Sequence, residues 1–278
     1  MKVFLTGGTG FIGSHVLKNL LASNIEVIAH RRKISSIPNI QIDYSINWLT
    51  KPASEIDVAD FHEVDVLLHL ASHSVQYPFD SLSNNIHYNV VEPLEMLEKA
   101  QQAGVTKYVV AGCCFEYGLS GERYDFIPTD APLEPTNDYA TSKAMSFLAF
   151  RQFALSKRVS LSYQRIFHAF GEGQPENRLW PSIKKAALES KDLELTPGKQ
   201  IRDFVPVEDV AKKLIQESVS IVRSESLIKI ENVGSGSPQS IAQFAEYWWR
   251  FWKAKGELKI GAIPYRNNEV YRYTPKLN

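Results

Sequence analysis

The sequence predicts an α/β fold in which a doubly wound parallel sheet carries a smaller, partly discontinuous C-terminal lobe. Short apolar runs alternate with amphipathic helical patterns through residues 1–166, which is typical of strands alternating with helices. The runs are apolar almost throughout, as are strands buried on both faces of a parallel sheet. Over residues 167–278 glycine and proline cluster and the alternation ends, so most of this region is expected to form the second lobe.

The periodicity of apolar residues places the elements of the first domain. The expected strands are Lys2–Leu5, Glu26–Ala29, Val64–Leu70, Lys107–Ala111 and Ser160–Ile166. The expected helices are Ile12–Ala22, Tyr88–Ala103 and Ala140–Leu155. Residues 34–61 have no clear pattern.

The second region contains fewer regular elements. We expect helices at Pro181–Ser190, Val207–Val222 and Ser240–Lys253. A strand is expected at Lys229–Asn232. Parts of about 200–235 are expected to return to the first domain.

Charge and cysteine content restrict the partners and the compartment. The 31 Lys and Arg residues match the 31 Asp and Glu residues, so no bulk charge favours nucleic acid or a membrane surface. No apolar run reaches the roughly 20 residues of a membrane helix. Because the glycine turn directly follows Val3–Leu5, we expect no signal peptide. The only cysteines, Cys113 and Cys114, are neighbours, which indicates a reducing, cytoplasmic compartment.

A glycine-rich turn at residues 7–13 predicts a dinucleotide site on a Rossmann fold. It follows a strand and opens a helix. Gly7 permits the tight turn, Gly10 lets backbone approach a pyrophosphate, and Gly13 lets the helix pack against the sheet. The residues between them are also expected to contact the cofactor: Thr9, Phe11 and Ile12. The alternative is a glycine turn without a ligand.

The end of the second strand favours NADP over NAD. NAD sites usually have an acidic residue here, which binds the ribose hydroxyls. This strand instead runs into His30, Arg31 and Arg32. A guanidinium can pair with a 2′-phosphate, so Arg31 and Arg32 are candidate NADP ligands; two solvated arginines are the alternative.

Tyr139 and Lys143 lie one helical turn apart on the same face. A nearby ammonium stabilises a phenolate and is expected to lower the tyrosine pKa from about 10 towards the working pH. Tyr139 could then exchange a proton with a carbonyl or alcohol oxygen. Alone, this spacing often arises by chance, but together with the glycine turn it indicates a nicotinamide-dependent oxidoreductase.

With these motifs the sequence resembles the extended short-chain dehydrogenases/reductases, the NAD-dependent epimerase/dehydratase family that acts on nucleotide sugars. The resemblance runs from residue 1 to about residue 273. Its markers, besides the glycine turn and the Tyr-Lys pair, are His69-Leu70-Ala71, Asn89, Glu116-Tyr117-Gly118, Arg165-Ile166-Phe167, Gly171, Arg202 to Val205, Val207 to Val210 and Asn232 to Gly234.

The resemblance implies further site residues. Lys143 would also hold the nicotinamide ribose, and Leu70, Ala71 and Phe167 would border the cofactor. The substrate, a nucleotide-diphosphate sugar, would be contacted by His168, Arg178 and Arg202. A guanidinium such as that of Arg202 suits the diphosphate. The alternative for Arg202 is an ion pair with Asp203, and the alternative for His168 is a neutral histidine in the core. No metal ligand is assigned.

Cys113 departs from the family pattern. Most members have serine or threonine there, which donates a hydrogen bond to the substrate oxygen, and a thiol is a weaker donor. We keep Cys113 as a candidate catalytic and substrate-binding residue. Filling of a buried strand end by Cys113 and Cys114 is the alternative.

The residues after Cys113 restrict the reaction that the resemblance implies. The 4,6-dehydratases have Asp-Glu where this chain has Cys114 and Phe115, and the fucose synthases have a cysteine and a histidine where it has Phe115 and Arg178. Dehydration and epimerisation beside the carbonyl are therefore disfavoured. The sequence of residues 114–118, Cys-Phe-Glu-Tyr-Gly, most resembles the group of CDP-abequose synthase and related 4-ketoreductases.

We therefore expect NADPH-dependent reduction of a nucleotide-linked 4-keto-6-deoxyhexose, a step in sugar-nucleotide biosynthesis for surface polysaccharide such as O-antigen. An NAD-dependent 4-epimerase is the alternative. A third hypothesis, from a different functional class, is a non-catalytic dinucleotide sensor. The resemblance also implies a homodimer. An apolar side of the Tyr-Lys helix is compatible with a dimer and with core packing: Met145, Phe147, Leu148, Phe150 and Phe153.

Overall fold

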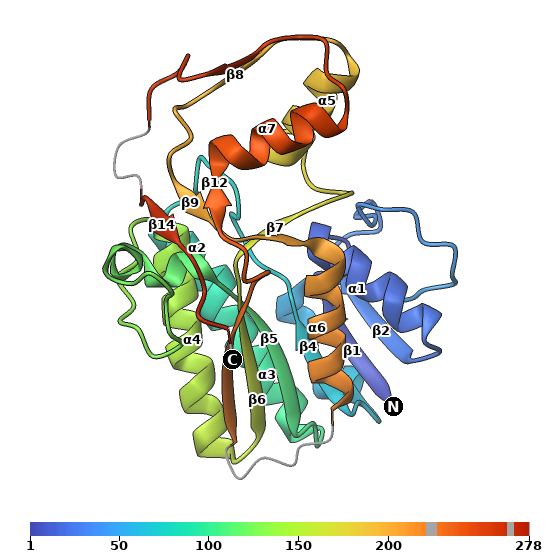
Figure 1. The fold of residues 1–278 in the computed structure, drawn as a ribbon. Helices are drawn as coiled ribbons and strands as arrows, with labels where there is room; N and C mark the ends of the chain where they lie inside the picture. The colour runs from blue at the N-terminus through green and yellow to red at the C-terminus, as the bar shows by residue number, and fades with distance from the viewer. Residues whose placement is uncertain (221–226, 266–269, 278) are drawn as a thin grey trace.

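The computed structural model describes residues 1–220, 227–265 and 270–277. A seven-stranded sheet lies at its centre, in the order β11-β6-β5-β4-β1-β2-β3, with every neighbouring pair parallel (Figure 1). The strands are β1 Lys2–Thr6, β2 Glu26–Arg31, β3 Asn47–Thr50, β4 Val66–His69, β5 Lys107–Cys113, β6 Ser160–Ile166 and β11 Ile228–Val233. The expected doubly wound α/β fold is confirmed.

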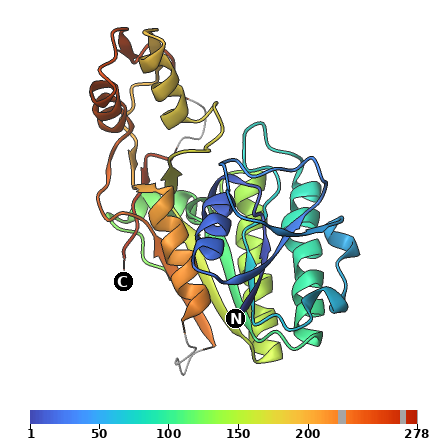
Figure 2. The same cartoon turned by 90° about the vertical axis from the view of Figure 1, so that its right-hand side faces the viewer.

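Helices cover both faces of this sheet (Figure 2). One face carries α1 Phe11–Ala22 and α6 Val207–Val219, and the other carries α2 Leu82–Ile86, α3 Glu92–Gln102 and α4 Asp138–Lys157. Successive side chains of a strand point to opposite faces. Val3 and Leu5 are therefore buried in the core beneath α1 and α6, whereas Phe4 is buried in the core beneath α3 and α4.

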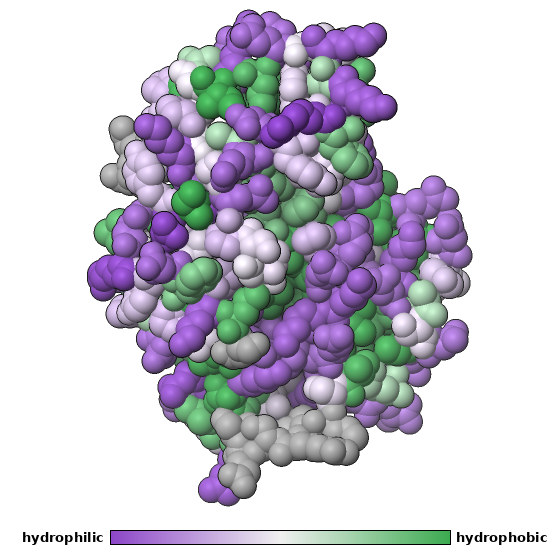
Figure 3. All heavy atoms as spheres, in the orientation of Figure 1, coloured by the Kyte–Doolittle hydropathy of each residue, from purple (hydrophilic) through white to green (hydrophobic). Residues whose placement is uncertain are grey.

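A small lobe stands beyond the carboxyl ends of the strands (Figure 1). Its elements are β7 His168–Phe170, α5 Leu179–Leu188, β8 Leu193–Leu195, β9 Ile201–Arg202, β10 Phe204–Pro206, β12 Gln239–Ser240, α7 Ile241–Phe251, β13 Leu258–Ile260 and β14 Arg272–Tyr273. Phe204 stacks on Phe244 of α7 with ring centroids 3.8 Å apart. Between these segments, α6 and β11 return to the main sheet. Figure 3 shows this face as largely hydrophilic, with apolar side chains visible between the lobe and the body.

The helix expected at Tyr88–Ala103 begins earlier, at Leu82, and is not uniformly α-helical. Ser81 caps its first turn, and a π-helical turn spans His87–Val91 between α2 and α3. Pro93 explains the π turn, because proline lacks an N–H and its ring would clash with the carbonyl of residue 89 in an α-helix. π turns of this kind are frequent at functional sites.

Other boundaries also differ from the expectation. The patternless region 34–61 contains the edge strand β3, which pairs with β2; four residues are too few to show a period. The end expected at Val222 lies outside the described residues, and α6 ends at Val219. Within the described part of the chain, no helix is long and apolar enough to cross a membrane.

Candidate active site

The glycine turn lies where the order of the strands reverses. β1 and β4 are neighbours at the centre of the sheet, and ligands of open α/β sheets bind at the carboxyl ends of such strands. Gly7 has φ +76°, and a Cβ on it would lie 2.6 Å from the Ala71 nitrogen. A Cβ on Gly13 would lie 2.0 Å from the Gly7 carbonyl oxygen. Only glycine fits at both positions, so the turn packs tightly on the segment after β4.

The cleft above this turn has the features of a phosphate-binding site. Gly10 is the N-cap of α1 and provides no side-chain cap, so the first amides and the positive end of the helix dipole are available to phosphates. The cleft has a volume of about 210 Å³ and gathers many of the expected cofactor residues: Gly7, Thr9, Gly10, Arg31, Arg32, Leu70 and Ala71. A nicotinamide dinucleotide bound here would lie between the glycine turn and the end of β4.

The two arginines at the end of β2 differ in their surroundings. Arg31 donates from Nε to Thr50 Oγ1 at 2.9 Å, and its guanidinium carbon lies 4.7 Å from the centre of the Trp48 ring. Arg32 is exposed at the rim of the same cleft. His30 beside them is buried, and burial lowers its pKa, so its imidazole is neutral.

Tyr139 and Lys143 lie in the first turns of α4, which begins after the Asn137 cap. Asn137 Oδ1 accepts a hydrogen bond from the Ala140 amide at 2.9 Å. Lys143 Nζ donates to the carbonyl oxygen of Ala111 on β5 at 2.9 Å. Both side chains are buried, at 5% and 4% exposure for Tyr139 and Lys143. Phe79 stacks on the Tyr139 ring at 5.8 Å.

The expected lowering of the Tyr139 pKa is wrong for this structure. Burial raises the pKa of Tyr139 well above 10, and the charges of Cys113 and Glu116 raise it further. Burial also lowers the pKa of Lys143. The ammonium of Lys143 does not offset the free-energy cost of burying a phenolate. Tyr139 is therefore a neutral phenol, which suits a proton donor.

Cys113 ends β5 and lies close enough to Tyr139 to raise the pKa of its phenol. A hydrogen bond from Cys114 lowers the pKa of Cys113, although burial acts in the opposite direction. Cys114 itself is packed in an apolar cluster with Tyr117 and Phe167.

A buried ion pair that has no local sequence pattern holds this strand end. Glu116 Oε2 accepts from Arg165 Nε at 2.8 Å, and both side chains are at most 1% exposed. Glu116 Oε1 accepts from the Cys113 amide at 2.7 Å and from the Tyr163 hydroxyl at 2.8 Å. Glu116 and Arg165 are separate family markers in the sequence, and the pairing of β5 with β6 brings them together.

The expected substrate residues lie around His168. Arg202 and Arg178 both lower the pKa of His168, in addition to its burial, so their charges are close to its ring and the ring is neutral. His168 Nδ1 is buried without a hydrogen-bond partner. Arg202 is buried and donates to the carbonyl oxygens of Ile201 and Val270. Arg178 donates to the carbonyl oxygen of Val75 at 2.7 Å, which joins the small lobe to the loop after β4.

A comparison with protein families identifies the family of this chain. The model described as the NAD dependent epimerase/dehydratase family matches residues 3–217. The chain belongs to this family. The matched region extends from β1 into α6 and so includes the glycine turn, Tyr139 and Lys143.

Individual relatives cover nearly the whole chain. The dTDP-6-deoxy-L-talose 4-dehydrogenase (NAD(+)) of Aggregatibacter actinomycetemcomitans is 26% identical over 275 residues, 96% of each protein. CDP-abequose synthase of Salmonella muenchen is 23% identical over 274 residues, 97% of this chain and 87% of the synthase. Among solved structures, the NAD dependent NDP-hexosamine 5,6-dehydratase TunA superposes with a TM-score of 0.86 at 28% identity, covering 99% of this chain and 88% of TunA. The expected similarity to CDP-abequose synthase is thereby confirmed.

Proposed function

We propose that this family member reduces the C4 keto group of a nucleotide-linked 4-keto-6-deoxyhexose with NADPH. The observation that carries the proposal is the buried, neutral Tyr139, one helical turn before the buried Lys143 on α4. Reduction of a ketone requires a proton donor at the developing alkoxide, and a phenol of high pKa holds its proton until that charge appears.

Each residue of the site has a role in this step. The nicotinamide, when bound, supplies the hydride. Tyr139 donates its proton to the carbonyl oxygen, and the Lys143 ammonium, held by the Ala111 carbonyl, stabilises the phenolate that remains. Arg178 and Arg202 place positive charge beside His168, where it can attract the diphosphate of the substrate. Phe167 is buried near the strand ends and would border the cofactor.

Dehydration receives no support from the surroundings of Cys113. The family's dehydratases are expected to have an acid and a base where this chain has Cys114 and Phe115. Cys114 is buried in an apolar cluster, and the Phe115 ring packs against His168 and Tyr273. Glu116 is bound to Arg165 and is not available as a base. The A. actinomycetemcomitans relative is named for oxidation at position 4 of a 6-deoxysugar nucleotide, the reverse of the proposed step.

A substrate screen tests the proposal. CDP-, dTDP-, GDP- and UDP-linked 4-keto-6-deoxyhexoses are incubated with NADPH or NADH, and loss of absorbance at 340 nm is followed. We expect oxidation of NADPH with at least one of them. Tightly retained NAD together with interconversion of UDP-hexoses would establish the 4-epimerase instead, and cofactor binding without any turnover would establish a sensor.

Arg32 is expected to determine the preference for NADPH. Replacing Arg32 with alanine should raise the KM for NADPH by about 10- to 100-fold, because a charge-assisted hydrogen bond contributes about 1.5–3 kcal/mol. The KM for NADH should change by less than about twofold, since NADH has no 2′-phosphate. Arg31→Ala should have a smaller effect, as Arg31 already contacts Thr50 and Trp48. Equal KM changes for both cofactors would contradict this role.

A second copy of the chain is the proposed partner. Phe147, Phe150 and Phe153 are buried against the sheet, whereas Met145 and Leu148 point outward on α4 with 38% and 59% exposure. Exposed apolar side chains at this spacing suit a helical interface. Leu148→Glu is expected to convert a dimer to a monomer in light scattering after size exclusion, and Leu188→Glu, on exposed α5, is the control. A monomeric wild-type protein would contradict the proposal.

A further inference from the structure

Ser72 lies near Tyr139, the residue that donates the proton in the proposed reaction. It follows Leu70 and Ala71 after β4 and lines the cofactor cleft. Its hydroxyl donates to Asn89 Oδ1 at 3.2 Å. The hydroxyl also lies close enough to the phenol to lower the pKa of Tyr139. Cys113, the other neighbour of the phenol, has only a thiol, which is a weak donor.

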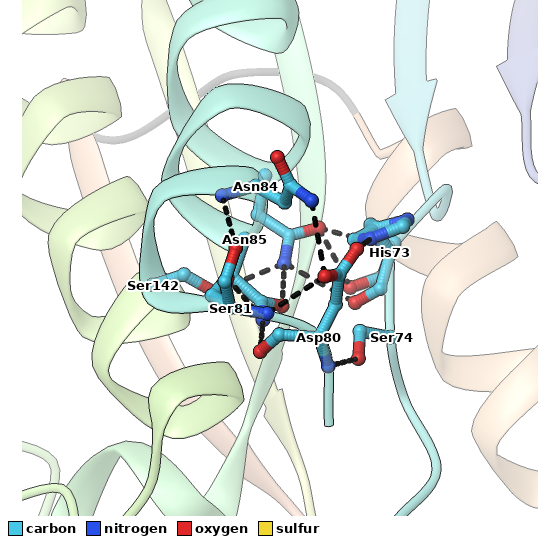
Figure 4. A network of polar contacts seen from close by, with 9 residues as sticks. His73, Ser74, Asp80, Ser81, Asn84, Asn85 and Ser142 are labelled. Atoms are coloured by element: carbon cyan, nitrogen blue, oxygen red, sulfur yellow. Dashed lines mark hydrogen bonds and ion pairs between the residues drawn. The ribbon is translucent and has the colours of Figure 1, made fainter. Parts of the chain in front are cut away.

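Asn89 in the π turn fixes the position of Ser72. Its Oδ1 also accepts from the His73 amide at 2.7 Å, and its Nδ2 donates to Ser142 Oγ at 2.9 Å. Ser142 Oγ in turn donates to the backbone carbonyl of Tyr139 at 2.7 Å. Figure 4 shows Ser142 reaching this network from α4, opposite His73 and Asp80. The same asparagine therefore ties Ser72 to the helix that carries Tyr139.

We propose that Ser72 is a catalytic residue that supplies the hydroxyl hydrogen bond to the reacting oxygen of Tyr139, in place of the serine or threonine absent at position 113. The inference rests on the proposed ketoreduction. A bound nicotinamide would supply the hydride for the new C–H bond at C4 and would be left oxidised, while the proton of Tyr139 passes to the carbonyl oxygen. Tyr139 is left as a phenolate until solvent returns a proton.

The hydroxyl of Ser72 can follow this change of charge. In the neutral state its proton points to Asn89 Oδ1 across the longer of the two bonds that this oxygen accepts. When the phenolate forms, rotation about the Cβ–Oγ bond directs the proton to Tyr139. Asn89 Oδ1 keeps the shorter bond from His73, so no buried acceptor is left unpaired. Hydrogen bonds to charged groups are roughly twice as strong as neutral ones, which favours the rotation.

Kinetics of Ser72→Ala test this role. The variant is expected to lower kcat for ketoreduction by about 10- to 100-fold, the range for a lost hydrogen bond to a charged group, with KM for NADPH unchanged. For the reverse oxidation, which needs the phenolate, the acidic limb of the pH profile should move to higher pH by about one unit, because the Ser72 bond lowers the pKa of Tyr139. A residue with only a structural role would not move that limb.

Two further variants separate the outcomes. Adding Cys113→Ser to the Ser72→Ala variant places a hydroxyl near the same phenol. The double variant should have a kcat at least tenfold above that of Ser72→Ala. Ser74→Ala is the matched control, since Ser74 bonds to the Asp80 amide, and it should retain wild-type kcat. A wild-type enzyme with no turnover of any keto sugar would contradict the proposed function. Turnover that Ser72→Ala retains in full, or a loss that Cys113→Ser leaves unrepaired, would overturn the role of Ser72.

Discussion

Replacing Tyr139 with phenylalanine is expected to lower kcat for ketoreduction by about 100- to 10,000-fold, the usual contribution of a positioned general acid. The change removes one oxygen and leaves the ring, which continues to stack on Phe79. Affinity for the cofactor should stay within about twofold, because the glycine turn and the end of β2 are untouched. Stopped-flow measurement of NADPH oxidation in a single turnover gives the chemical step directly.

Tyr88→Phe provides the control for this experiment. Tyr88 lines the cofactor cleft, is partly exposed and packs on His73. It should retain wild-type turnover. Retention of more than a tenth of the wild-type rate by Tyr139→Phe would show that another group protonates the sugar oxygen.

Replacing Glu116 with glutamine is expected to destabilise the protein by about 3–5 kcal/mol, the typical effect of removing one partner of a buried ion pair. Arg165 would remain buried with its charge uncompensated, although Tyr117 and the Thr129 carbonyl would still accept from its guanidinium. The free energy of unfolding, measured by denaturant titration monitored by fluorescence, gives the effect.

The exposed pair of Glu176 and Lys185 is the control for Glu116. Its atoms are 3.0 Å apart, but both side chains are more than half exposed. Solvent screens such a pair, so Glu176→Gln should leave the unfolding midpoint nearly unchanged. An equally small effect of Glu116→Gln would show that the ion pair beneath Cys113 does not hold the strand end in place.

The sequence predicted the parts of this fold that have a strong local pattern. The strands of the sheet, the glycine turn and the Tyr-Lys helix are recognisable because apolar periodicity and glycine spacing depend on neighbouring residues. The four residues of β3 and the asparagine-rich start of α2 have no such period. β3 is stabilised by pairing with β2, and the start of α2 depends on the cap from Ser81.

The site depends more on contacts between distant segments, and these were harder to predict. Glu116 and Arg165 are far apart in sequence and meet only because β5 pairs with β6. Ser72 had one available signal, a polar residue directly after the Leu70-Ala71 segment assigned to the cofactor. The pKa of Tyr139 depends on burial, which the spacing of Tyr139 and Lys143 cannot show.

Transfer of deuteride tests the central claim most directly. The protein is incubated with NADPH deuterated at C4 of the nicotinamide and with the 4-keto-6-deoxysugar nucleotide selected by the screen, and the sugar product is analysed by NMR and mass spectrometry. We expect one deuterium per product molecule at C4 of the sugar, with one equivalent of NADP formed. A product without deuterium, or conversion of UDP-hexoses on retained NAD with no net consumption of NADPH, would contradict the assignment as a ketoreductase.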